Sequence, residues 1–312
     1  IYRVAKRSQV INALINAIKN GKMVTVVVEL QARFDEENNM YWSNIMREHG
    51  AKLIYGVPGL KVHSKLIQIT RVDGKKEQLI THVGTGNFNG DTAKLYSDFS
   101  LFTAKPEISR EVKKVFNLLE NNIERGIYRS IFVSPFNTRR KFIELINKEI
   151  KNSKKGIPAS IDIKLNSLVD SKLINKLYDA SKAGVKIRII VRGICCLIPG
   201  KPGFSENIEA KSIIGRYLEH GRFFVFQNGG TPKYYISSAD WMTRNLDKRI
   251  EVTAPILDEA IQKEIQDVFD IMWRDNVKAR VIDEFQKNRY VRRNDDEALH
   301  NSQQELFEYY KG

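Results

Sequence analysis

The sequence predicts an α/β fold built from two similar halves, and three observations favour it. Apolar runs of strand length alternate with amphipathic helical patterns along most of the chain. The pattern from Ile11 to Gly21, followed by an apolar run, recurs from Ile174 to Gly184, followed by another such run. The 312 residues also suit two domains, at roughly 150 residues each. We therefore expect a duplicated α/β unit, with each copy a mixed sheet flanked by helices.

The elements of the first half are expected from periodicity and turn residues. Gly21 ends the first helix, Asp73-Gly74 is typical of a hairpin turn, and Pro106 is favoured in the first turn of a helix. In chain order we expect a helix at 8–20, a strand at 23–30, a helix at 35–50, a strand at 52–55, hairpin strands at 65–71 and 78–83, and a helix at 106–120.

The second half repeats the alternation. We place the boundary between residues 125 and 130, which gives domains 1–128 and 129–312. The expected elements are a strand at 130–134, a basic helix at 139–154, a strand at 160–165, a helix at 171–183, a strand at 186–192, a helix at 213–219, strands at 223–227, 234–238 and 249–253, a helix at 257–273, and a last helix at 305–310 in a charged tail.

Charge indicates a polyanionic partner. The chain carries 51 Lys and Arg against 37 Asp and Glu, a net charge of +14. Because both halves share the excess, it is not a basic tail, and a surface of this kind suits nucleic acid, anionic lipid or chains of phosphate. A solvated basic surface with no polyanionic partner is the alternative that charge alone leaves open.

Two broad classes of protein are disfavoured. No apolar run approaches the ~18 residues that a membrane helix needs. The two cysteines, Cys195 and Cys196, are neighbours in sequence and cannot link distant loops, so we expect a reducing, cytoplasmic location rather than a disulfide scaffold. The first residue is Ile1 and a helical pattern follows at once, so we expect an N-terminally truncated chain.

The sharpest local motif is His63-Ser64-Lys65, followed after the hairpin by Gly84-Thr85-Gly86-Asn87. A neutral imidazole can attack phosphorus, and a nearby ammonium, hydroxyl, amide and glycine N–H groups can hold phosphate oxygens. This combination resembles a half-site of the phospholipase D superfamily. When residues 238–240 are aligned on 85–87, residues 231–233 (Thr-Pro-Lys) fall opposite the histidine motif. A second His-x-Lys is then missing, which disfavours a plain phosphodiesterase.

Longer motifs resemble a more specific family, the classical bacterial polyphosphate kinases. They are QARFDE at 31–36, GTGNFNGDTAKLYSDFSL at 84–101, KLNSLVD at 164–170, YLEH at 217–220 and SSADWMTRN at 237–245. The resemblance covers nearly the whole chain and implies the C-terminal catalytic portion of such an enzyme. It implies two phospholipase D-like α/β domains, the second with a helical tail.

The resemblance also assigns roles to individual residues. His63 matches the histidine that is phosphorylated, and His220 matches a second catalytic histidine that also contacts nucleotide. Asp98 and Glu251 follow the two loops, and we expect each carboxylate to orient a histidine, although structural ion pairs are an equal alternative. The remaining expected positions are Tyr96, Arg192, Lys65 and Asn87 for nucleotide or phosphate, and Arg3 and Arg33 for the magnesium site. Because arginine cannot ligate a cation, we expect that pair to hold Mg²⁺-bound phosphates.

The implied activity is reversible transfer of the terminal phosphate of ATP to inorganic polyphosphate through a phosphohistidine. ATP, ADP and polyphosphate are the expected partners and Mg²⁺ the expected cofactor. No nucleic acid is expected, and the full-length protein is expected to be a homo-oligomer. Two alternatives stay open: a phospholipase D-like phosphodiesterase or nuclease, and a catalytically silent polyanion-binding fragment.

Overall fold

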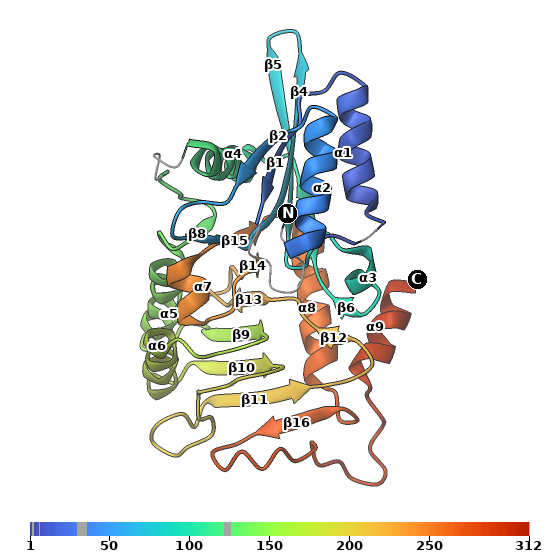
Figure 1. The fold of residues 1–312 in the computed structure, drawn as a ribbon. Helices are drawn as coiled ribbons and strands as arrows, with labels where there is room; N and C mark the ends of the chain where they lie inside the picture. The colour runs from blue at the N-terminus through green and yellow to red at the C-terminus, as the bar shows by residue number, and fades with distance from the viewer. Residues whose placement is uncertain (2, 6, 30–35, 122–125, 312) are drawn as a thin grey trace.

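The computed structural model describes all residues except 2, 6, 30–35, 122–125 and 312. Its two halves lie at opposite ends of an elongated molecule, with the first half at the top of the view and the second half below (Figure 1). Helices and strands alternate in both halves, so the expected α/β class is confirmed. No helix in the described part of the chain has the length and apolar character needed to cross a membrane.

The second half is organised around a mixed sheet. Two helices, α5 (Thr138–Ser153) and α6 (Ser171–Lys182), pack on one face, and α8 (Glu259–Trp273) lies on the other (Figure 1). In the described residues the strand order is β16 (Ala279–Ile282), β11 (Ile208–Ile213), β10 (Lys186–Val191), β9 (Ser160–Leu165), β13 (Phe223–Phe226), β14 (Lys233–Ser237), β15 (Arg249–Ile256) and β3 (Lys61–Val62), with β8 (Phe132–Ser134) also paired to β15.

The first half contains two smaller sheets. One is the parallel pair β1 (Thr25–Val28) and β2 (Lys52–Tyr55). The other is antiparallel, in the order β4 (Lys65–Asp73), β5 (Lys76–Gly84) and β7 (Ser100–Thr103). The helices of this half are α1 (Gln9–Lys19), α2 (Glu36–Glu48), the short α3 (Gly90–Ala93) and α4 (Pro106–Asn121).

The internal duplication is visible in the order of the elements. In the first half, strands β4, β5 and β7 form an antiparallel sheet, with α3 before the last strand and α4 after it. In the second half, β13, β14 and β15 repeat this order, with α7 (Thr243–Lys248) and α8 in the same places. The parallel pair β1–β2 likewise corresponds to the parallel pair β10–β11.

Short strands link the two halves crosswise. From the first half, β3 pairs in parallel with β15, and Lys61 lies opposite Arg249. From the second half, β12 (Leu218–Glu219) pairs in parallel with β6 (Tyr96–Ser97), and Leu218 lies opposite Tyr96. Helices α4 and α8 also bury residues in one hydrophobic cluster together with β15. The halves therefore share a core, and the two strand pairs fix the backbone where they meet.

The expected helix at 213–219 is wrong. Strand β11 ends at Ile213 and β12 covers Leu218–Glu219, where the Leu218 N–H donates to the Leu95 carbonyl at 2.8 Å. Residues 218 and 219 are extended because they pair with β6 of the first half. Tertiary structure thus overrides the local helix preference of this segment. Gly215 in the middle of the segment further weakens a helix.

Candidate active site

His63 and Glu251 form the first of two histidine–carboxylate pairs. His63 lies between β3 and β4, and its Nδ1 is 2.8 Å from Oε1 of Glu251 on β15. The Glu251 side chain is 1% exposed. It also accepts hydrogen bonds from Ser238 Oγ at 2.5 Å and from Asn245 Nδ2 at 2.7 Å. A carboxylate held on three sides fixes the plane of the imidazole and keeps a proton on Nδ1.

His220 and Asp98 form the second pair. His220 follows β12, and its Nδ1 is 2.8 Å from Oδ1 of Asp98, between β6 and β7. The Thr85 hydroxyl donates to the same carboxylate at 2.6 Å, just as Ser238 donates to Glu251. Each carboxylate therefore lies within hydrogen-bonding distance of a histidine ring nitrogen.

The two pairs are related by the duplication, and each one spans both halves. The His63 N–H donates to the Ile250 carbonyl at 3.0 Å, and the His220 N–H donates to the Ser97 carbonyl at 3.2 Å. Each histidine thus comes from one half while the carboxylate beside it comes from the other. Neither half alone contains a complete pair.

The structure corrects the alignment of the second half. The counterpart of His63-Ser64-Lys65 is not residues 231–233 but His220-Gly221-Arg222. Lys65 lies opposite Gly84 on β5, and the carbonyl of Arg222 accepts a hydrogen bond from the N–H of Ser237 at the end of β14. The β13–β14 hairpin of the second half is shorter than the β4–β5 hairpin of the first half. Because the alignment was anchored at the residues after the hairpin, it placed the counterpart of the histidine motif too far along the chain. A second His-x-Lys is absent, as expected, but the second half carries a histidine motif of the form His-x-Arg at the equivalent position.

Lys65 and Arg222 occupy equivalent positions beside the histidines. The Lys65 ammonium donates to the His63 carbonyl, and Arg222 Nη1 donates to the His220 carbonyl at 2.9 Å. Arg222 also forms a 3.0 Å ion pair with Asp240, and its Nη1 lies 3.3 Å from Nε2 of His220. Burial lowers the pKa of Lys65 to about 7. Arg222 was not identified from the sequence. The available signal was its spacing, because Arg222 follows His220 by two residues, as Lys65 follows His63.

Both histidines are held in the neutral form. Burial lowers the pKa of His63 to about 3, and burial also lowers the pKa of His220. Burial alone would raise the pKa of the Glu251 carboxyl, but the contacts with His63, Lys65 and Ser238 hold it below its ordinary value. A neutral imidazole with its proton on Nδ1 has its lone pair on Nε2, the form that can attack phosphorus.

Two expected nucleotide-contact positions lie beside His220. The ring of Tyr96 has its centroid 5.3 Å from that of His220. Arg192 Nε donates to Asn166 Oδ1 at 3.1 Å and to the Glu219 carbonyl at 2.9 Å. These contacts place an aromatic ring and a guanidinium at the edge of the second pair.

The remaining expected residues are less closely tied to the histidines. Asn87 follows Thr85 and Gly86 after β5, and Arg3 precedes α1. In the described part of the chain, Asn87 forms no hydrogen bond with either histidine. Arg33 lies outside the described residues. The residues that the structure describes hold no group of three or more His, Cys, Asp or Glu that could bind a metal ion.

Comparison with known proteins identifies the family. The family model described as polyphosphate kinase C-terminal domain 1 matches residues 1–125, and C-terminal domain 2 matches residues 131–303. The chain belongs to the polyphosphate kinase family. Its resemblance to the C-terminal portion of these enzymes, expected from the motifs, is confirmed.

Individual relatives agree with this membership. The chain is 49% identical over 311 residues to polyphosphate kinase of Escherichia coli strain K12, covering 100% of this chain and 45% of that protein. The polyphosphate kinase of Vibrio cholerae is 51% identical over 311 residues, with 100% of this chain and 44% of that protein covered. The chain therefore spans about half the length of the curated relatives it matches.

Solved structures show the same fold. The crystal structure of polyphosphate kinase from Porphyromonas gingivalis superposes with a TM-score of 0.92 at 43% identity, covering 100% of this chain and 48% of that one. Phosphatidylserine synthase of Haemophilus influenzae shares the fold alone, with a TM-score of 0.58 at 9% identity over 99% of this chain and 87% of that one. The α/β fold expected from the sequence is thus confirmed, and it is the fold of a solved polyphosphate kinase.

Proposed function

We propose that this chain carries the catalytic site of a kinase that reversibly transfers the terminal phosphate of ATP to inorganic polyphosphate. The observation that supports this most is the neutral His63, oriented through Nδ1 by Glu251 and placed beside the buried amino group of Lys65. Such a group is a nucleophile toward phosphorus. Membership of the polyphosphate kinase family supports the choice of substrates.

The proposed reaction has two steps. In the first, Nε2 of His63 forms a bond to the terminal phosphorus of ATP, the bond from that phosphorus to the bridging oxygen breaks, and ADP leaves. In the second, a terminal oxygen of polyphosphate attacks the same phosphorus, and the bond to Nε2 breaks. The chain has then grown by one phosphate and His63 is free for another cycle. Each step is an in-line transfer, so the reverse direction uses the same groups.

Cations of the site would stabilise the charge that moves during transfer. Lys65 lies on the His63 side, while Arg222 and Arg192 lie on the His220 side. Fixed positive groups in a site shielded from water lower the barrier of phosphoryl transfer because they need no reorganisation. His220, with its Nδ1 held by Asp98, would direct Nε2 toward a substrate oxygen and exchange a proton or hydrogen bond there.

Magnesium enters this proposal as part of the nucleotide substrate. Because the described residues offer no three-ligand cluster, they do not fit a magnesium cage made by the protein. We propose that Mg²⁺ arrives bound to ATP phosphates, which Arg3 and Arg33 help to hold. We further propose a cytoplasmic enzyme without nucleic-acid partners, homo-oligomeric in the full-length protein.

One observation favours a second candidate function. Because His220-x-Arg222 is the counterpart of His63-x-Lys65, the chain has two histidine half-sites, as a phosphodiesterase with one nucleophile and one acid requires. Hydrolysis of a phosphodiester is therefore the alternative that the experiment must separate.

Labelling with ATP tests the proposal. Incubation with γ-³²P-ATP and Mg²⁺ should leave an acid-labile label on the chain, and His63→Ala should abolish it. His49→Ala is the matched control, because that histidine is exposed and should leave the label intact. Label that survives His63→Ala would contradict the proposal. No label on the wild type together with cleavage of a diester would favour the phosphodiesterase, and neither activity would favour a silent binding fragment.

A further inference from the structure

A basic cavity lies at the other end of the strands that build the histidine site. Its volume is about 440 Å³, within the range of small-ligand pockets. It is lined at the start of β14 by Lys233 and near the end of β15 by Pro255. At the opposite ends of these strands, Ser238 directly after β14 and Glu251 on β15 belong to the histidine site. Four residue steps along a strand span about 13 Å, so the two sites are separate.

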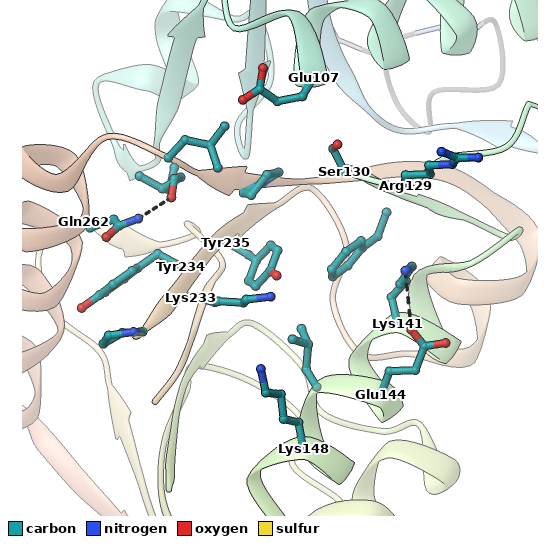
Figure 2. A pocket seen from close by; sticks show the side chains of 16 residues that line it. Glu107, Arg129, Ser130, Lys141, Glu144, Lys148, Lys233, Tyr234, Tyr235 and Gln262 are labelled. Atoms are coloured by element: carbon teal, nitrogen blue, oxygen red, sulfur yellow. Dashed lines mark hydrogen bonds and ion pairs between the residues drawn. The ribbon is translucent and has the colours of Figure 1, made fainter. Parts of the chain in front are cut away.

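The cavity is rich in unpaired positive charge. Its cationic lining residues are Arg129, Lys141, Lys148 and Lys233, against the acidic Glu107 and Glu144. Glu144 is already engaged by Arg140 and, at 3.5 Å, by Lys141. Among the described residues, the side chains of Arg129, Lys148 and Lys233 take part in no ion pair. In Figure 2 these lysines extend toward the space in front of Tyr235.

The hydroxyl of a mostly buried tyrosine also faces this cavity. Tyr235 is only 6% exposed and lines the cavity, packed against Phe132 with ring centroids 4.9 Å apart. Its hydroxyl has no hydrogen-bond partner among the residues that the structure describes. Because burial raises the pKa of Tyr235 to about 12, the group keeps its proton and can donate it. A ligand oxygen in the cavity would therefore accept a hydrogen bond from this hydroxyl.

We propose that this cavity binds an oligophosphate group as a second anion site, distinct from the histidine site. Several separated cations and one hydroxyl donor suit a ligand with many charged oxygens better than a single carboxylate. The group can belong to an inorganic phosphate chain or to the phosphate tail of a nucleotide, and the two sources share this recognition. The proposal does not depend on phosphoryl transfer at His63.

Tyrosine NMR can test this site directly. In a chain labelled with ¹³C-tyrosine, the Tyr235 ring signal is assigned through Tyr235→Phe, and tripolyphosphate is then titrated at fixed ionic strength. We expect the Tyr235 signal to shift in the wild type and equally in His63→Ala. Lys148→Gln/Lys233→Gln should weaken the apparent affinity at least 10-fold. The matched control is Lys151→Gln/Lys155→Gln, which removes two exposed charges that do not line the cavity and should titrate as the wild type does.

The outcomes separate the sources and decide the proposal. A shift with tripolyphosphate and also with ADP indicates that any oligophosphate is accepted, whereas a shift with only one of them identifies the source. Adenosine, which lacks phosphate, should give none. The proposal is overturned if Tyr235 does not shift with millimolar tripolyphosphate or ADP, or if Lys148→Gln/Lys233→Gln titrates like the control. Loss of His63 labelling with an intact Tyr235 response would count against the proposed kinase function only.

Discussion

Glu251 of the second half accepts a hydrogen bond from His63 of the first half, with 2.8 Å between Oε1 and Nδ1. The same relationship recurs in reverse between His220 and Asp98. Each pair takes one member from each half, and the charge of Lys65 beside His63 also acts on His220, so the duplication produces one shared site rather than two separate ones. The crosswise strand pairs β3–β15 and β6–β12 hold the backbone of all four residues in place.

Removing the charge of Glu251 should slow phosphorylation of His63. In Glu251→Gln the amide keeps the size of the side chain but no longer stabilises the tautomer with its proton on Nδ1. We expect the rate of labelling by γ-³²P-ATP to fall by about 10² to 10⁴-fold. Glu259→Gln, an exposed change at the start of α8, is the control and should label at the wild-type rate. A rate for Glu251→Gln within about threefold of the wild type would show that the carboxylate is only structural.

Gly86 should be essential for the second pair. A Cβ at this position would collide with the carboxylate of Asp98, so Gly86→Ala must displace Asp98 from His220. Because small displacements of catalytic groups are costly, we expect transfer from ATP to polyphosphate to fall by about 100-fold. Gly90→Ala is the matched control, since a Cβ there meets nothing within 4 Å. Equal activity of the two alanine variants would rule out a catalytic role for the Asp98–His220 contact.

His82 should make stability depend on pH without affecting catalysis. It is buried on β5 between Phe88 and Phe102, and burial lowers its pKa to about 4. As the pH falls below the ordinary histidine value of about 6.5, the unfolded chain therefore takes up a proton before the folded chain does. Stability contributed by the neutral ring is complete above about pH 6.5 and is lost as the pH falls toward 4, by at most about 3 kcal/mol.

Urea unfolding at several pH values checks this prediction. His82→Phe keeps an aromatic ring between the two phenylalanines but cannot titrate, so the free energy of unfolding should fall less between pH 6.5 and 4.5 than in the wild type. The labelling of His63 at pH 7.5 should be unchanged. If the two proteins lose the same free energy over this interval, titration of His82 does not contribute.

Much of the fold could be predicted from local patterns. The strands at 52–55 and 160–165 match β2 and β9, because both are short segments rich in Ile, Leu or Tyr and bounded by turn residues, a pattern that favours a strand. The helix at 171–183 is close to α6, whose first turn is capped by Asp170 accepting from the Leu173 N–H at 3.1 Å. Strands β3, β6 and β12 were missed because each is two residues long and exists only through pairing with the other half.

The residues of the candidate site could be predicted from the sequence, but the contacts between them could not. Residues His63, His220, Asp98 and Glu251 came from motifs, and the structure brings them together in pairs. Which carboxylate contacts which histidine could not be predicted, because a resemblance within each half says nothing about an exchange between halves. The position of Arg222 was missed for a related reason: the unequal hairpins hide its equivalence to Lys65.

The measurement that most directly tests this account is the position of phosphate on the imidazole of His63. Because Nδ1 donates to Glu251, only Nε2 is available as the nucleophile. After brief reaction with ATP, ³¹P NMR of the denatured protein at alkaline pH distinguishes the two phosphohistidine isomers, and peptide mass spectrometry locates the modified residue. We predict Nε2-phosphohistidine at position 63. Phosphate on Nδ1, or on another residue such as His220, would contradict the proposed mechanism.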